Sequence, residues 1–142
     1  MIWFGGHKPV PAAMTELGAT SMAGLLGIEF VDVGDDWLSA RMPVDHRTHQ
    51  PFGRLHGGAS VALAETVASI GGAMTLDPTK SVTVGMEVNA NHIRPATSGH
   101  VTAVATAQSL GRTTQIWTIR ITDGSDRLIC LSRITLAVIA PR

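Results

Sequence analysis

One stretch of the sequence, residues 58–76, constrains the fold more than any other. Apolar and small side chains point in almost every direction around a helical wheel over this stretch, whereas a helix on a protein surface has a single apolar stripe. The residues that carry this pattern are Val61, Leu63, Ala64, Val67, Ala68, Ile70, Gly71, Ala73 and Met74. We therefore expect a helix that is buried on most of its sides.

Alternation of apolar and polar residues predicts the strands that cover this helix. It places Val82, Val84, Met86, Val88 and Ala90 on the buried face of a strand that ends near Pro95. The same period of two runs through residues 101–108 and 114–122, and residues 127–139 are predicted to form a final strand. Residues 25–33 and 37–44 are predicted to form a hairpin around a turn at 34–36, and residues 11–17 a short helix. These elements predict an α+β fold in which an antiparallel sheet wraps around one long central helix.

Length and charge limit the class of protein. The 142 residues suffice for one domain and leave no room for a second. Eleven Lys and Arg balance eleven Asp and Glu, so no net field attracts nucleic acid or an anionic membrane. Charged residues make up only 15% of the chain, which favours a homo-oligomer whose subunits bury part of the surface.

The cysteine content and the N-terminus indicate the compartment. Cys130 is the only cysteine, so no disulfide forms within the chain, which fits a reducing compartment. Residues 1–10 lack the apolar core of a signal peptide, and no stretch is apolar enough to span a membrane. We therefore expect a cytoplasmic protein.

Glu65 is the candidate catalytic carboxylate, because it lies in the middle of the apolar helix. Burial of a carboxylate is costly unless something compensates, and it raises the pKa toward that of a useful base. The alternative is that Glu65 faces a wet subunit interface or pairs with a basic side chain.

A polar loop at residues 45–56 leads into the start of this helix. Gln50 lies in this loop, and His56-Gly57-Gly58 follows where the free N–H groups of a helix N-terminus can hold an oxyanion. Glu65 lies about 11 Å further along by the helical rise, so a substrate must lie beside the helix or between two subunits. The alternative is a flexible helix entry with Gln50 as an ordinary surface residue.

Several other chemistries lack their usual sequence patterns. His46, His49 and His56 have neither an HExxH spacing nor paired cysteines, so no metal site is expected. The chain also lacks the GxSxG, Walker and GxGxxG motifs of serine hydrolases, NTPases and dinucleotide-binding proteins. Arg94, at a predicted strand end, and Arg112, in a predicted turn, are candidate phosphate contacts, with solvated surface charges as the alternative.

Four segments together resemble the hotdog-fold acyl-CoA thioesterases. The resemblance is nearest to the branch of 1,4-dihydroxy-2-naphthoyl-CoA hydrolase and the phenylacetate-pathway (PaaI-like) thioesterases, and it implies a single hotdog domain over residues 1–142. The segments are Gln50-Pro51-Phe52-Gly53, His56-Gly57-Gly58-Ala59-Ser60, Ala64-Glu65 and Gly85-Met86-Glu87-Val88-Asn89-Ala90-Asn91-His92.

The resemblance implies a role for each catalytic candidate. Glu65 is the nucleophile or general base, while the Gly57 N–H and Gln50 polarise the thioester carbonyl. His56 orients the loop or contacts the thioester, and Ser69 places water or substrate. Thr66 and Ile70 lie beside the acyl group, which is expected to be aromatic.

The resemblance also implies how coenzyme A and other subunits are held. Coenzyme A, which is part of the substrate and not a cofactor, is expected near Val84, Gly85, His92, Arg94, Gly111, Arg112 and Thr113. Dimers that pair into a tetramer are implied, with each active site built from two subunits. A hotdog hydroxyacyl-thioester dehydratase and a non-catalytic acyl-CoA-binding module remain as alternatives.

Overall fold

A six-stranded antiparallel sheet curves around one long helix, α3 (Gly57–Met74). The computed structural model describes residues 1–142, and the strand order in the sheet is β1-β2-β4-β5-β6-β3. The strands are β1 (Glu29–Val33), β2 (Trp37–Pro43), β3 (Val82–His92), β4 (His100–Leu110), β5 (Thr114–Thr122) and β6 (Leu128–Ile139). A 3₁₀ turn, η1 (Phe4–Gly6), and the short helices α1 (Pro11–Leu17) and α2 (Met22–Leu25) precede the sheet. The predicted α+β class and hotdog architecture are thus confirmed.

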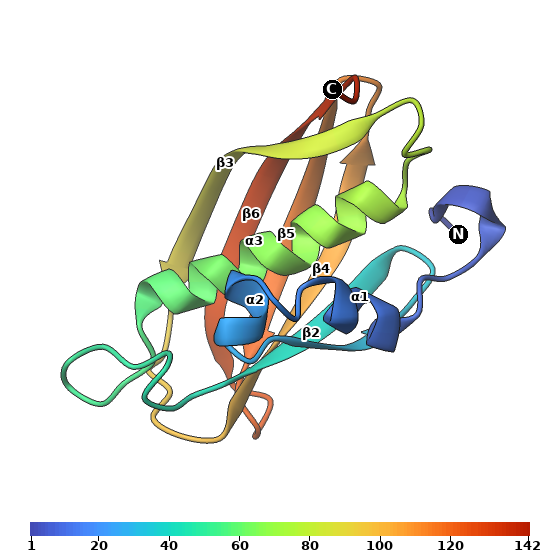
Figure 1. The fold of residues 1–142 in the computed structure, drawn as a ribbon. Coiled ribbons are helices and arrows are strands. Elements are labelled where there is room, and N and C mark those ends of the chain that lie inside the picture. The colour runs from blue at the N-terminus through green and yellow to red at the C-terminus, as the bar shows by residue number, and fades with distance from the viewer.

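Helix α3 is covered on most of its sides, as its composition predicts. Figure 1 shows it lying lengthwise against the sheet, with β3 along one side and the α1–α2 segment on the other. Only Gly58 and Ala73 within the helix are exposed. A Cβ at Gly71 would lie 2.7 Å from Leu38 and 3.1 Å from Trp117, so this glycine lets the helix approach the sheet closely. None of the helices combines the length and the apolar character that a membrane span requires.

The central strands bury the faces that alternation predicts. On β5 the side chains of Gln115, Trp117, Ile119 and Ile121 are all at most 1% exposed. The ring of Trp117 stacks on that of Trp3, with 6.4 Å between ring centroids, so the N-terminus joins the core. The predicted turn at 34–36 is present, because Gly34 N–H donates to the carbonyl of Trp37.

Strand β3 departs from the predicted alternation. Its pairing with β6 shifts between Gly85 and Glu87, which marks a β-bulge at Met86. Because the bulge inserts one extra residue, the side chains on either side of it follow opposite phases. Gly85 therefore faces α3, whereas Val84 is 45% exposed and Met86 62% exposed. The prediction that Val84 and Met86 share the buried face was wrong, and the strand ends at His92, before Pro95.

The predicted strand over residues 25–33 begins later than expected. Met22–Leu25 forms α2, and the chain passes through Gly27 at φ +72° before β1 begins at Glu29. The Ile28 N–H donates to the carbonyl of Ala23, which closes the end of this helical turn. Residues 25–28, which the apolar pattern assigned to a strand, therefore belong to the end of α2 and the turn that follows it.

Candidate active site

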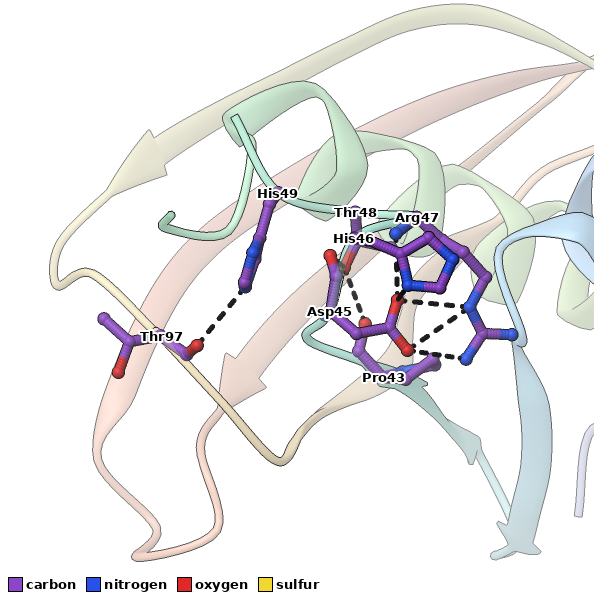
Figure 2. A network of polar contacts seen from close by, with 7 residues as sticks. All are labelled: Pro43, Asp45, His46, Arg47, Thr48, His49 and Thr97. Atoms are coloured by element: carbon purple, nitrogen blue, oxygen red, sulfur yellow. Dashed lines mark hydrogen bonds and ion pairs between the residues drawn. The ribbon is translucent and has the colours of Figure 1, made fainter. Parts of the chain in front are cut away.

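Thr48 fixes the loop between β2 and α3, which the sequence predicted as a polar loop at 45–56. Its buried hydroxyl donates to the carbonyl of Pro43 at 2.7 Å, and Figure 2 shows this contact at the end of β2. The carbonyl of Thr48 accepts from the N–H of His56, the residue before α3. Thr48 thereby ties the end of one element to the start of the other.

Asp45 and Arg47 form an ion pair at the beginning of the loop (Figure 2). Arg47 Nη2 lies 2.8 Å from Asp45 Oδ2, and Arg47 also donates its backbone N–H to Asp45. These hydrogen bonds from Arg47 hold the pKa of the Asp45 carboxyl well below its usual range. The pair stabilises the turn that leads toward Gln50.

The three histidines of this loop occupy separate positions. His46 is largely exposed, 3.9 Å from Asp45 Oδ1. His49 Nε2 lies 3.2 Å from the carbonyl of Thr97, as Figure 2 shows. His56 precedes α3, and its Nδ1 accepts from the N–H of Gly58 at 2.8 Å. The structure does not bring them together as ligands of one metal.

The amide of Gln50 is oriented by a backbone contact. Its Oε1 accepts from the N–H of Phe52, and this assignment is chemically required because a backbone N–H can only donate. Gln50 Nε2 is therefore left as a donor, and Gln50 lines a cavity of about 350 Å³. This arrangement suits the predicted contact with a carbonyl oxygen.

The start of α3 contributes to the same cavity. The N–H of Gly57 has no acceptor in the chain, as expected for the first residue of a helix. Because His56 Nδ1 accepts from Gly58, the neutral ring of His56 carries its proton on Nε2. The cavity is lined by Gln50, Leu55, Gly57, Ser60, His92, Ile93, Arg94, Pro95, Ala96 and Ile129. Ser60 was not predicted, because a hydroxyl near a helix start is too common to single it out.

Glu65 lies apart from this cavity. Its half-buried carboxylate rests against Gly85 of β3, and it forms no hydrogen bond or ion pair with the rest of the chain. The alternative in which Glu65 pairs with a basic side chain is therefore not seen within one chain. Gly57 and Glu65 are separated by about 12 Å along the helix axis.

The predicted acyl-contact residues line a second cavity, of about 300 Å³. Thr66 and Ile70 lie in its wall, together with Ser69, one helical turn after Glu65. The opposite wall comes from α1, α2 and β1 and includes Met14, Leu17, Met22 and Phe30. The hydrophobic pattern did not predict this wall, because it does not place α1 and α2 against α3.

The residues predicted to hold coenzyme A separate into two groups. Val84 and Thr114 pair with Ala137 from opposite sides of β6, so Gly111, Arg112 and Thr113 lie at the same end of the sheet as the start of β3, with β6 between them. His92 and Arg94 lie at the other end of β3, about 25 Å away by the rise of a strand. Arg94 donates to the carbonyl of Leu128 at 3.0 Å. One chain alone therefore does not assemble these residues into one surface.

Comparisons with known proteins identify the family. A model of the Thioesterase superfamily matches residues 52–130. The 1,4-dihydroxy-2-naphthoyl-CoA hydrolase of Escherichia coli K12 is 47% identical over 139 residues, which cover 98% of this chain and 100% of that protein. The family is one of thioester hydrolases, which supports the predicted hydrolase over the dehydratase and the non-catalytic module.

Solved structures of two thioesterases share the fold. That of PA1618 from Pseudomonas aeruginosa, a glutamine-to-alanine mutant, gives a TM-score of 0.96 at 45% identity and covers 99% of this chain and 100% of that chain. SAV0944 from Staphylococcus aureus was solved as a glutamate-to-alanine mutant, with a TM-score of 0.82 at 39% identity over 84% of this chain and 99% of that chain. It was also solved as a glutamine-to-alanine mutant. Since the sequence motifs, the sheet around α3 and these matches agree, the chain belongs to the Thioesterase superfamily.

Proposed function

We propose that the protein hydrolyses acyl-CoA thioesters with Glu65 as nucleophile or general base. The observation that carries this proposal is the Glu65 carboxylate, which is half-buried beside β3 and has no partner within its own chain. Because no hydrogen-bond donor or cation occupies this carboxylate, it is available to activate water or to attack an acyl carbon. The Escherichia coli relative is a 1,4-dihydroxy-2-naphthoyl-CoA hydrolase, which supports coenzyme A as the leaving group here.

A second copy of the chain completes the site in this proposal. Strand β3 is an edge of the sheet, and it contacts Glu65 through Gly85 and Gly57 through His92. Antiparallel pairing of two β3 strands about a two-fold axis near Val88 brings Gly85 of one subunit beside the partner's His92. Glu65 then approaches the partner's Gly57, which removes the separation along the helix.

We also propose that such dimers pair into a tetramer. The low share of charged residues supports a second buried surface. Apolar side chains remain at least 40% exposed on β3 and β6 of the single chain, namely Val84, Met86, Leu131 and Ile139. These side chains provide apolar area for that second contact.

The chemistry requires an oxyanion site and one carboxylate. The thioester oxygen accepts from the Gly57 N–H and Gln50 Nε2, and His56 Nε2–H is a further donor at the same helix start. Glu65 either takes a proton from the water that attacks the acyl carbon, or attacks that carbon itself to form a mixed anhydride that water then cleaves. In both routes the carbon–sulfur bond breaks and coenzyme A leaves as a thiolate, which takes up a proton.

The spacing of two mutated residues in a relative supports the pairing of Gln50 with Glu65. In SAV0944 the glutamate and the glutamine that were replaced by alanine lie 15 positions apart. Gln50 and Glu65 are separated by the same 15 positions. The separation supports assigning this pair to the reacting thioester.

We propose that the acyl group is aromatic and occupies the cavity between α3 and the α1–α2 segment. The walls of this cavity are mostly apolar, and Ser69 lies in its wall one turn from Glu65. A flat ring buries much apolar area with few rotatable bonds to immobilise, whereas an acetyl group leaves most of the cavity unfilled. The binding energy of the ring is then available to stabilise the transition state.

The nucleotide end of coenzyme A is assigned to the two groups of residues at the ends of β3. Antiparallel pairing of two β3 strands brings Val84, Arg112 and Thr113 of one subunit toward the partner's Arg94. Arginine suits the phosphates, because its guanidinium is always charged and donates two parallel hydrogen bonds. Arg112 is exposed in the β4–β5 turn and forms no ion pair within the chain.

The test compares the protein with its Glu65→Gln variant on benzoyl-CoA and acetyl-CoA. We expect thiol release from benzoyl-CoA with the higher kcat/KM, and a loss of about 100-fold or more in the variant with its fold retained. Release of thiol without formation of an alkene excludes a dehydratase. Near-normal turnover by the variant would refute the role of Glu65, and equal kcat/KM for the two substrates would refute the aromatic preference.

A further inference from the structure

Gly85 faces the Glu65 carboxylate across the gap between β3 and α3. A Cβ placed on Gly85 would lie 2.5 Å from Glu65 Oε1 and 3.6 Å from Glu65 Cδ. Apart from the chain neighbours of Gly85, no other heavy atom lies within 4 Å of that position. The carboxylate therefore occupies the space that any side chain at position 85 would take.

The backbone does not require a glycine at this position. Gly85 is not among the residues with positive φ, so its conformation is open to any amino acid. Glycine inside a strand lowers stability, because the unfolded chain loses more conformational freedom on folding. Space for Glu65 is thus the one structural reason that the local geometry offers for glycine here.

The β-bulge at Met86 determines that a glycine, and not a methionine, meets Glu65. Beyond the bulge, the partly buried Val88 and Ala90 lie two and four residues after Met86. Regular alternation back from Val88 would turn Met86 toward α3, where its long side chain would meet the carboxylate. The inserted residue shifts this phase and presents Gly85 instead.

We propose that Gly85 is a positioning residue that sets the place of the Glu65 carboxylate, a role that rests on the proposed function of Glu65. No hydrogen bond from the chain holds this carboxylate, so van der Waals contact with the backbone of β3 limits its position on that side. This role acts on the position of the reacting carboxylate. A contact between Gly85 and coenzyme A would instead act on the affinity for the substrate.

The test is the Gly85→Ala variant, assayed on benzoyl-CoA beside the unaltered protein and Glu65→Gln. The added methyl displaces the carboxylate, and a misplacement of about 1 Å costs on the order of 100-fold in kcat while KM stays within about threefold. The Tm is expected to stay equal or to rise, because alanine is the better strand residue. Gly124→Ala is the matched control, since open space surrounds a Cβ at Gly124 and its φ is not positive.

A double variant separates displacement of the carboxylate from other effects of the methyl group. Asp is one methylene shorter than Glu, so in Gly85→Ala it retreats from the new methyl. We therefore expect Glu65→Asp to cost much less kcat in the Gly85→Ala background than in the unaltered protein.

The contrary outcomes distinguish failure of the proposed function from failure of the positioning role. If Glu65→Gln keeps its turnover, the proposed function fails, and the role of Gly85 fails with it. If Glu65→Gln is inactive but Gly85→Ala keeps its kcat or changes only KM, the positioning role alone is refuted. The positioning role is also refuted if the loss of kcat in the double variant equals the product of the losses in the two single variants.

Discussion

The two residues that matter most for the chemistry are recognisable in the sequence for different reasons. Glu65 is conspicuous because a carboxylate interrupts an apolar helix, and the structure places it half-buried without a partner. Gln50 is a polar residue in a polar loop, so only the segment Gln50-Pro51-Phe52-Gly53, through its resemblance to the family, identified it. Its donor becomes apparent in the structure, where the Phe52 N–H occupies Gln50 Oε1 and leaves Nε2 free.

Gln50→Ala is expected to lower kcat by about 100-fold to 1000-fold, the usual loss when one oxyanion donor is removed. KM for benzoyl-CoA is expected to change little, because the hydrogen bond strengthens as charge develops on the oxygen. The measurement is steady-state thiol release, with Gln108→Ala as control, since Gln108 is an exposed amide on β4 away from both cavities. A rise in KM at constant kcat would show that Gln50 binds the ground state instead.

At the scale of elements, the alternation of apolar and polar residues predicts which side chains of a strand are buried, until a β-bulge reverses the order of the two faces. The four buried positions of β5 follow their pattern, because nothing interrupts the pairing of that stretch. Strand β3 is predicted as an element, but the bulge at Met86 arises in its pairing with β6, which is distant in sequence. The same limit applies to the second cavity, whose outer wall arises from packing of α1 and α2 against α3.

The ion pair at the start of the 45–56 loop makes its stability depend on pH. Because Arg47 lowers the folded-state pKa of Asp45 below the unfolded value near 3.8, the stabilisation is present above that value and is lost as the pH falls toward the folded pKa. Asp45→Asn is therefore expected to lower Tm at pH 7, by an amount that shrinks below about pH 3.8.

Melting curves between pH 3 and pH 7 provide the measurement for this loop. The control is Asp36→Asn, an exposed aspartate with no ion pair, whose Tm is expected to follow that of the unaltered protein at every pH. A Tm difference for Asp45→Asn that stays constant across this range would show that the pair with Arg47 does not stabilise the fold.

For the molecule as a whole, the central question is why one chain separates the two halves of its chemistry. The helix start with Gly57 and Gln50 lies at one end of β3, and Glu65 contacts β3 at Gly85, closer to the other. Helix α3 is a rigid spacer of about 12 Å between Gly57 and Glu65, so no side-chain movement within one chain closes the distance. The edge of β3 is the element of the single chain that contacts both halves and retains an unpaired side.

Mixing two inactive variants tests this two-subunit arrangement directly. In a random mixture of Glu65→Gln and Gln50→Ala subunits, half of the dimers are mixed, and each mixed dimer has one site with both changes and one site with neither. About a quarter of the normal activity is therefore expected to return, although each variant alone is nearly inactive. Subunits are exchanged by unfolding and refolding together, with each variant refolded alone as control. If both halves of a site came from one chain, every site in the mixture would carry a change, and activity would stay at the level of the single variants.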